Sequence, residues 1–383
     1  MTETLVQLTA ADFDEAIDFL NLVFGMYQPH DFVNLLPALY RPTDEHMGHN
    51  LAIRRHGRIA AIVGMFPISW HVGGRVLRLA GIGGVSTHAR WRSGGLMRAL
   101  MEECLRRMQA DGCEASWLGG LRQRYRHFGY EVCGHHLAFT LSKRNATAAG
   151  MAPPIRFEPL VDGDPARIAM AATLHEAQTA RCVRLRQDFP LYLRNWHHKA
   201  QAALGDHGKM LAYLVTNGKG DYVPEVAAET PAVAFEVLRA WALQREGGDI
   251  SIEVAPHEVE LARRLGVWAE HVQVRPAANW QILQWQPLLG AMLALQQSCR
   301  PLPEGSVVIR PGASRPLRLS VRDGHATCTP TDDRPDVDAE TSTLMRALFG
   351  PLRPSQVIPL PGAACALEGW CPLPLYLPRQ DTV

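Results

Sequence analysis

One stretch constrains the fold of this chain more than any other, the run from Gly83 to Tyr130. It begins with the end of a strand-like segment, continues through a Ser-Gly-Gly turn, and then shows apolar residues spaced as on one face of a helix. These are Met97, Leu100, Met101, Cys104, Leu105 and Met108. Asp111-Gly112 is a helix end, and Ala115–Gly119 has the composition of a short buried strand. Strand, helix and strand in this order predict a parallel pair with a right-handed crossover.

The turn from Arg92 to Met97 has the chemistry of an anion site. A helix that begins directly after a strand leaves its first backbone N–H groups unpaired, and these groups attract anions. Gly94 and Gly95 carry no Cβ atom that would block a phosphate, and Arg92 adds a charged donor. We therefore interpret the turn as a pyrophosphate site. A Ser-Gly-Gly sequence that serves only to cap the helix is the structural alternative.

Composition limits the classes of partner. The length of 383 residues predicts two or three domains, and a net charge of +1 disfavours a nucleic acid partner. No apolar run approaches the roughly 20 residues of a membrane span. The eight cysteines show no spacing that suits zinc, so we expect no metal site and mostly reduced, buried thiols in a cytoplasmic protein.

Other phosphate-binding and hydrolytic motifs are missing from the sequence. There is no GxxxxGK[ST] loop, no GxGxxG that opens a helix after a strand, no HExxH and no GxSxG. These gaps leave a phosphate-bearing carrier such as coenzyme A as the expected ligand of the turn.

The run RWRSGGLMRAL, with YRHFGYE about thirty residues later, resembles the GNAT superfamily of acyl-CoA-dependent N-acetyltransferases over roughly residues 1–145. The family motif, Arg/Gln-x-x-Gly-x-Gly/Ala, is met by Arg92 and Gly95, whereas Met97 departs from it in the last place. The layout of the whole chain is similar to the enhanced intracellular survival type, in which that place often holds a large apolar residue.

This resemblance implies an α/β architecture in three parts. Residues 1–147 would be an acetyl-CoA-binding GNAT catalytic domain, residues 148–284 a degenerate GNAT-like domain, and residues 285–383 an α+β sterol-carrier-like domain with a C-terminal tail. It also implies a homo-oligomer, possibly a hexamer.

The residue pattern adds local predictions to this architecture. Three strands over Leu51–Arg55, Ile59–His71 and Arg75–Val85 should form an antiparallel meander. A helix is expected over Phe32–Leu39, and a small-residue and proline linker after Lys143. Further helices are expected over Pro165–Val183, Phe189–Ala203, Pro231–Arg245, Trp285–Gln297 and Ala339–Phe349, with a hairpin at Asp323-Gly324.

The resemblance also assigns roles to site residues. The backbone of Val85 and Thr87 would bind the pantetheine arm, and the N–H of Val85 would stabilise the oxyanion. The pyrophosphate would be held by Arg92, Ser93, Gly94, Gly95, Leu96 and Met97. Tyr125 falls where the family places its general acid, since a neutral tyrosine supplies a proton to the departing thiolate. The alternative is that Tyr125 only forms an aromatic cluster with Phe128 and Tyr130.

The general base is harder to assign. In the enhanced intracellular survival type the terminal carboxylate takes this role, which here would be Val383, although a frayed terminus is the ordinary expectation. His88 and His127 are weaker candidates. Arg181, Arg184 and Arg186 beside Asp188 form a basic cluster that we expect on a solvated helix face.

Together these features predict an N-acetyltransferase that moves an acetyl group from acetyl-CoA to a primary amine by direct attack in a ternary complex. The acceptor would be a small-molecule amine or a peptide, with no nucleic acid or membrane partner. Two alternatives stay open: a non-catalytic acyl-CoA sensor, and a lipid carrier with a vestigial first domain.

Overall fold

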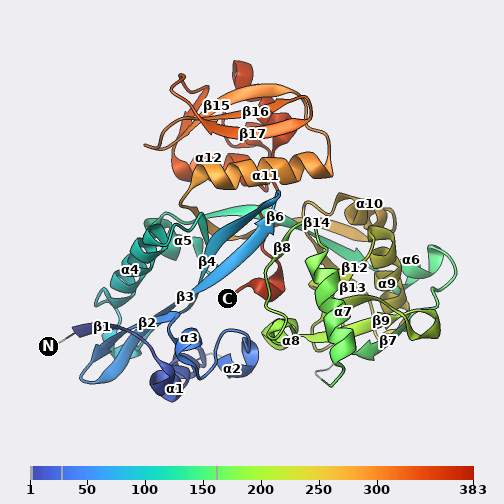
Figure 1. Ribbon diagram of the computed structural model, residues 1–383, viewed down its shortest axis with the longest axis horizontal. Coiled ribbons are helices and arrows are strands. Elements are labelled where there is room, and N and C mark those ends of the chain that lie inside the picture. Colours follow the sequence, from blue (N-terminus) through green and yellow to red (C-terminus); the bar gives the residue numbers. More distant parts are fainter. Residues whose placement is uncertain (1–2, 27–28, 161–162) are drawn as a thin grey trace.

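A computed structural model describes residues 3–26, 29–160 and 163–383 (Figure 1). Its central element is a 10-stranded sheet. The strands are β1 (Glu3–Gln7), β2 (Asn50–Arg55), β3 (Arg58–Val72), β4 (Arg75–Thr87), β5 (Ala115–Leu118), β6 (Glu131–Leu141), β8 (Arg181–Cys182), β11 (Tyr222–Val223), β13 (Ile250–Val254) and β14 (His271–Ile282). They follow the order β1-β2-β3-β4-β5-β14-β6-β13-β11, and β8 pairs with β3.

The predicted strand-helix-strand unit is confirmed. Strands β2, β3 and β4 form an antiparallel meander, and β4 pairs in parallel with β5. The connecting helix α4 (Leu96–Ala110) buries its apolar stripe against the sheet, as its spacing predicted. Strand β5 ends at Leu118, opposite Ile82, whereas β4 continues to Thr87. The two strands therefore separate beyond this pair.

A β-bulge interrupts β4 at this point of separation. Gly83 lies opposite Gly64, and Ser86 lies opposite Ile62, so that Gly84 and Val85 share a single partner position on β3. Gly84 adopts a φ of 59°, a left-handed conformation that glycine reaches without a steric cost. The glycines at the end of this strand thus mark a bulge.

The face of the sheet opposite α4 is covered by α1 (Phe13–Phe24), α2 (Phe32–Leu35) and α3 (Asp44–Met47). Helix α1 begins after a capping box between Thr9 and Asp12. The prediction of a helix over Phe32–Leu39 was wrong in its length. Pro37 excludes Leu36 from the helical region, and Leu36 takes φ −134° and ψ 63°.

The sheet continues from the first third of the chain into the second. Strand β14 lies antiparallel between β5 and β6, and β13 pairs with the other edge of β6. A second sheet, in the order β12-β10-β9-β7, packs beside it. Its strands are β7 (Arg156–Pro159), β9 (Lys199–Leu204), β10 (Met210–Thr216) and β12 (Glu225–Ala228), and its helices are α7 (Pro165–Glu176), α8 (Phe189–Arg194), α9 (Pro231–Gln244) and α10 (Val259–Trp268).

Two predicted helices in this region were too long. Helix α7 stops at Glu176 and is followed by β8, and the run predicted as one helix from Phe189 divides into α8 and β9. Trp196 breaks it with a φ of 65°. The predicted linker also contains a helix, α6 (Lys143–Ala148), and the buried Arg239 side chain donates to carbonyl oxygens of the segment, including that of Met151 at 2.8 Å.

The last third begins with the apolar helix α11 (Trp285–Cys299), which packs between the large sheet and a third sheet (Figure 1). This third sheet has the order β17-β16-β15-β18. Its strands are β15 (Gly305–Pro311), β16 (Leu317–Arg322), β17 (His325–Pro330) and β18 (Val337–Ala339), followed by α12 (Thr341–Phe349) and α13 (Ala366–Trp370). The predicted hairpin at Asp323-Gly324 is confirmed.

All eight cysteines are free thiols, and six of them are buried. In the part of the chain that the structure describes, no helix combines the length and the apolar character needed to cross a bilayer.

Candidate active site

A cleft of about 610 Å³ opens where β4 and β5 separate. It is lined by the end of β4, by the turn that leads into α4, by the start of α4 and by the segment after α5 (Arg122–Tyr125), with Val23 and Phe24 of α1. The lining includes every residue predicted to bind the carrier, namely Val85, Thr87, Arg92, Ser93, Gly94, Gly95, Leu96 and Met97. Tyr125 and Val383 lie outside this lining.

The turn has an unusual backbone. Gly95 is the N-cap of α4 with a φ of 76°, and Ser93 is left-handed as well, with a φ of 65°. A Cβ atom built on Gly95 would meet no atom within 4 Å, so a side chain would have room there. Glycine is required because of the left-handed backbone conformation and not because of the available space. This conformation directs the first N–H groups of α4 toward the open cleft.

The charges along the cleft suit a polyanion. The described lining contains three arginines, Arg92, Arg98 and Arg124, and no carboxylate among its side chains. The Nε atom of Arg92 lies 3.5 Å from the carbonyl oxygen of Thr87, so its side chain bends back over the end of β4. Coenzyme A carries a pyrophosphate and a further phosphate, and guanidinium groups bind both kinds of group well.

Sequence reasoning missed Arg98 and Arg124. Arg98 is the third residue of α4, where a side chain lies near the anion-binding end of the helix. Arg124 directly precedes the tyrosine that the motif identified. Both positions were therefore visible as neighbours of predicted site residues. His127 lines the cleft too, while His88 accepts a hydrogen bond from the N–H of Arg90.

Tyr125 lies on α5, and not at the end of β5 as its position after the strand suggested. Its side chain is buried, with 5% of the residue exposed, and its ring lies 6.4 Å from that of Tyr130. Burial raises the pKa of Tyr125, and the neighbouring Arg124 opposes this shift. The phenol is therefore neutral at physiological pH and retains a proton that it can donate.

The other two aromatic residues of this segment have different environments. Tyr130 is fully buried in the core, and its hydroxyl lies 2.7 Å from the Oγ atom of Ser116. Phe128 is half-buried and lines the cleft. Helix α5 is fixed by Arg122, whose Nη2 atom donates to the buried Glu131 carboxylate at 2.7 Å.

The C-terminus lies against β4, on the face opposite α4. A Cβ atom built on Gly83 would lie 3.2 Å from the carboxyl carbon of Val383, and one built on Gly81 would lie 2.7 Å from the Cγ2 atom of Val383. A side chain at Gly81 would clash with the Val383 side chain, and one at Gly83 would crowd the terminal carboxyl group. Figure 1 shows the C-terminus at the centre of the molecule.

Several contacts hold the terminal residues, so the terminus is not frayed. Gln380, Asp381 and Thr382 are buried. Asn195 donates to the carbonyl oxygen of Gln380 at 2.8 Å, and the indole N–H of Trp196 lies 3.1 Å from the hydroxyl of Thr382. The guanidinium of Arg379 stacks over Trp196 at 3.9 Å.

The strongest of these contacts involves Arg184. Its guanidinium donates to both carboxylate oxygens of Asp381, at 2.7 and 2.8 Å, and to Glu225 at 2.7 and 2.9 Å. The expectation that Arg184 lies on a solvated helix face was wrong, because the chain after β8 is extended and directs this side chain inward. Arg186 is exposed and pairs with Glu176.

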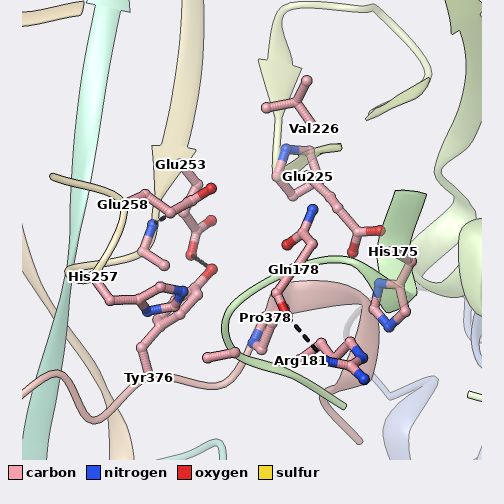
Figure 2. A pocket seen from close by; sticks show the side chains of 13 residues that line it. His175, Gln178, Arg181, Glu225, Val226, Glu253, His257, Glu258, Tyr376 and Pro378 are labelled. Carbon is pink, nitrogen blue, oxygen red and sulfur yellow. Dashed lines mark hydrogen bonds between the residues drawn. The ribbon is translucent and has the colours of Figure 1, made fainter. Parts of the chain in front are cut away.

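The base of the tail borders a small cavity of about 40 Å³, shown in Figure 2. Tyr376 donates to Glu253 at 3.1 Å, and Glu258 accepts the N–H of Ala255 at 3.0 Å. Burial raises the pKa of Glu258 to about 7, with a smaller contribution from the negative charge of Glu225 and an opposing one from the Ala255 hydrogen bond.

Glu258 predicts a pH-dependent stability. Its pKa is raised in the folded protein, so the stability that it contributes is complete below the pKa of an unfolded glutamate and is lost as the pH rises through about 7. We expect Glu258→Gln to raise the melting temperature at pH 8 by a few degrees, roughly the effect of 1 kcal/mol, and to change it little at pH 5.

Scanning calorimetry at pH 5, 6, 7 and 8 measures this difference. The control is Glu260→Gln, because Glu260 lies on the same helix and forms exposed ion pairs with Arg263 and Arg264. An equal shift at every pH in Glu258→Gln would contradict the prediction.

Comparison with known proteins agrees with this geometry. Residues 5–133 match the family model described as an acetyltransferase (GNAT) domain. None of the curated protein sequences compared with the chain matches it.

Solved structures match along the full length of the chain. A GCN5-related N-acetyltransferase from Kribbella flavida is 20% identical, with a TM-score of 0.67 and 100% of both chains covered. Eis1 from Mycobacterium abscessus is 15% identical, with a TM-score of 0.69 and the same coverage. A GCN5-related N-acetyltransferase from Anabaena variabilis ATCC 29413 is 15% identical, with a TM-score of 0.67 and 100% of both chains covered. The predicted α/β GNAT fold is thereby confirmed, and it includes residues 5–133, which match the acetyltransferase (GNAT) domain model.

Proposed function

We propose that this protein is an N-acetyltransferase that moves an acetyl group from acetyl-CoA to a primary amine by direct attack in a ternary complex. One observation carries the proposal. A single strand, β4, borders a cationic cleft at its C-terminal end and carries the chain's own terminal carboxylate against Gly81 and Gly83. The GNAT domain match supports acyl transfer in general, and the identity of the acceptor is part of the proposal.

The cleft residues fit coenzyme A. The unpaired N–H groups at the start of α4 and the Arg92 side chain would hold the pyrophosphate, as the open left-handed turn permits. The backbone of Val85 and Thr87 would bind the pantetheine arm, because β4 has no partner strand on this edge beyond Ile82. Arg98 and Arg124 supply further positive charge for the remaining phosphate.

The reaction requires a neutral amine. An alkylamine with a pKa near 10.4 is neutral in about one molecule in two thousand at pH 7, a cost of roughly 4–5 kcal/mol. In our proposal the Val383 carboxylate takes the ammonium proton, directly or through a water. The C–N bond then forms, the C–S bond breaks, and the Val85 N–H stabilises the oxygen that becomes negative. Tyr125 gives its proton to the departing sulfur, and the acylated nitrogen returns its second proton to the Tyr125 oxygen, directly or through a water.

The domain organisation and the oligomeric state are also proposed. We divide the chain into a catalytic GNAT domain of residues 1–147, a degenerate GNAT-like domain of residues 148–284 and a sterol-carrier-like domain of residues 285–383. These bounds divide the chain by position in the sequence. They do not divide the large sheet, which includes strands from the first two parts. We also propose a homo-oligomer, possibly a hexamer, which light scattering of the purified protein would measure.

The proposed activity is tested by thiol release from acetyl-CoA. The purified protein is offered a panel of polyamines, aminoglycosides, amino acids and peptides, with the release of free thiol followed over time. Release above the rate without acceptor supports the transferase. Binding of coenzyme A without thiol release for any acceptor would favour the non-catalytic sensor, and lipid extracted from the purified protein would favour the carrier.

The Tyr125→Phe variant tests the general acid. We expect it to lower kcat by about 10²-fold or more, since general acid catalysis contributes factors of this size. Binding of coenzyme A, measured by titration calorimetry, should change little because Tyr125 is not among the residues that line the cleft.

Tyr130→Phe is the matched control. It removes another buried hydroxyl, whose partner is Ser116 at 2.7 Å, and should lower stability by about 1 kcal/mol while leaving turnover intact. Equal activity of Tyr125→Phe and the unmodified protein would remove Tyr125 from the mechanism.

A further inference from the structure

The hydroxyl of Tyr40 has no use in the reaction described so far. Tyr40 is 1% exposed, and its Oη atom has no hydrogen-bond partner among the described residues. Its ring packs edge-on against Phe32 at 5.2 Å and against Phe66 at 5.6 Å. A buried hydroxyl without a partner costs about 1–3 kcal/mol. Phenylalanine would fill the same space without that cost, so packing does not explain the hydroxyl.

The position of this hydroxyl is informative. It lies 2.7 Å from the point that a Cβ atom on Gly84 would occupy, directly against the bulge of β4. A Cβ atom on the preceding Gly83 would meet the carboxyl carbon of Val383 at 3.2 Å and the ring of Phe66 at 3.3 Å. Successive residues of a regular strand face opposite sides of the sheet. At this bulge, adjacent residues face the same side, and the Tyr40 hydroxyl and the Val383 carboxylate lie beneath them.

A second hydroxyl without a partner lies on the same face. Ser86 is 4% exposed, and its Oγ atom has no partner in the described part of the chain. Ser86 pairs with Ile62, which belongs to the hydrophobic core that also contains Tyr40. Two buried hydroxyls without partners therefore flank the bulge. Buried polar groups are usually hydrogen-bonded, and exceptions at one place indicate a group that binds there.

We propose that Tyr40 is a positioning residue for the acceptor. Its hydroxyl oxygen accepts one N–H of the primary amine, directly or through one water, while the Val383 carboxylate accepts another. With these two N–H groups fixed, the third points toward the thioester carbonyl at the bulge. When a water passes that third proton to Val383, the nitrogen lone pair appears in its place and faces the carbonyl. This inference rests on the proposed transferase function and adds a residue from the segment after α2.

Packing around Tyr40 supports a fixed geometry. The ring lies between Phe32 and Phe66, and the Leu20 side chain packs nearby, at 3.4 Å from the Cβ position of Gly84. Burial raises the pKa of Tyr40, so the hydroxyl stays neutral and keeps its lone pairs for the amine. A hydroxyl held this rigidly loses little entropy when it binds a ligand.

The test compares Tyr40→Phe with the unmodified protein, using an acceptor identified by the thiol-release panel. We expect kcat/KM for the amine to fall about 10- to 100-fold, as for loss of a hydrogen bond to a charged group. The KM for acetyl-CoA should not change. The melting temperature should stay the same or rise, because the Tyr40 hydroxyl has no hydrogen-bond partner among the residues that the structure describes. Ser86→Ala should lower kcat/KM for the amine in the same direction.

The outcomes separate this inference from the proposed function. An active unmodified protein with an equally active Tyr40→Phe variant would overturn the role of Tyr40 and leave the transferase in place. A parallel rise of both KM values would show a general disturbance of the fold and also overturn it. If the unmodified protein releases no thiol with any amine, the proposed function fails and this inference fails with it. Tyr130→Phe again provides the control for loss of a buried hydroxyl.

Discussion

Replacing the terminal carboxylate of Val383 by a carboxamide is expected to lower kcat by about 10²-fold or more, the usual contribution of a general base. The amide has nearly the shape of the carboxylate but cannot take a proton from an ammonium group. The buried Gln380, Asp381 and Thr382 should hold it in the same place, since their contacts do not involve the terminal charge. Protein ligation with an amidated peptide supplies this variant.

Two comparisons make the result specific. Val383→Leu keeps the carboxylate and should retain most of the activity, although its larger side chain must fit beside Gly81. A single glycine added after Val383 moves the carboxylate away and should resemble the amide. Coenzyme A binding should be normal in all three, because Val383 is not among the residues that line the cleft. Full activity of the amide would exclude Val383 as the base.

Local sequence was sufficient to predict the strand, turn and helix that line the cleft. The stripe of α4, the glycines before it and the strand after it are encoded within thirty residues, and each feature has a direct physical meaning. Glycine suits a left-handed N-cap, and a single apolar stripe indicates that one face of the helix is buried. Where a proline was overlooked, as at Pro37, the predicted helix was too long.

Long-range contacts were not visible in the same way. Strand β14 pairs with β5, more than 150 residues earlier in the chain, and nothing in its local pattern specifies that partner. Its first residues, His271 to Arg275, are exposed on both faces of the sheet. This part of the strand therefore has no alternation of buried and exposed residues that would fix its register against the neighbouring strands. Tyr40 was not recognised either, because a single tyrosine between two prolines matches no sequence motif. Its hydroxyl becomes a candidate site group only through its position against the bulge at Gly84.

The resemblance to a family supplied what local patterns did not. The proximity of Val383 to β4 was expected only by analogy, and its contacts to Gly81 and Gly83 now support the analogy with geometry. The residues that keep the tail there were misjudged. A cluster of three arginines within six positions resembles a solvated surface, and its central member is buried because its partners come from distant segments.

Arg184 is the position at which we expect the largest loss of stability. Its side chain is 0% exposed, and its two partners, Glu225 and Asp381, are almost as deeply buried. Removing the guanidinium in Arg184→Met leaves two carboxylates without a counter-charge, which typically costs about 3–5 kcal/mol. The exposed pair of Arg186 and Glu176 gives a matched control, since Arg186→Met should cost at most about 1 kcal/mol.

Urea denaturation at pH 7 measures both free energies of unfolding. Burial raises the pKa of Glu225, but Arg184 outweighs this effect and holds the value at about 2. Because this pKa is lowered, its contribution to stability is present at neutral pH and is lost as the pH falls toward 2. Arg184→Met should therefore lose more stability at pH 7 than at pH 4. A double variant that combines Arg184→Met with Asp381→Leu should recover part of the loss. Equal costs for Arg184→Met and Arg186→Met would show that the tail is not anchored by this buried network, and the position of Val383 would then need another cause.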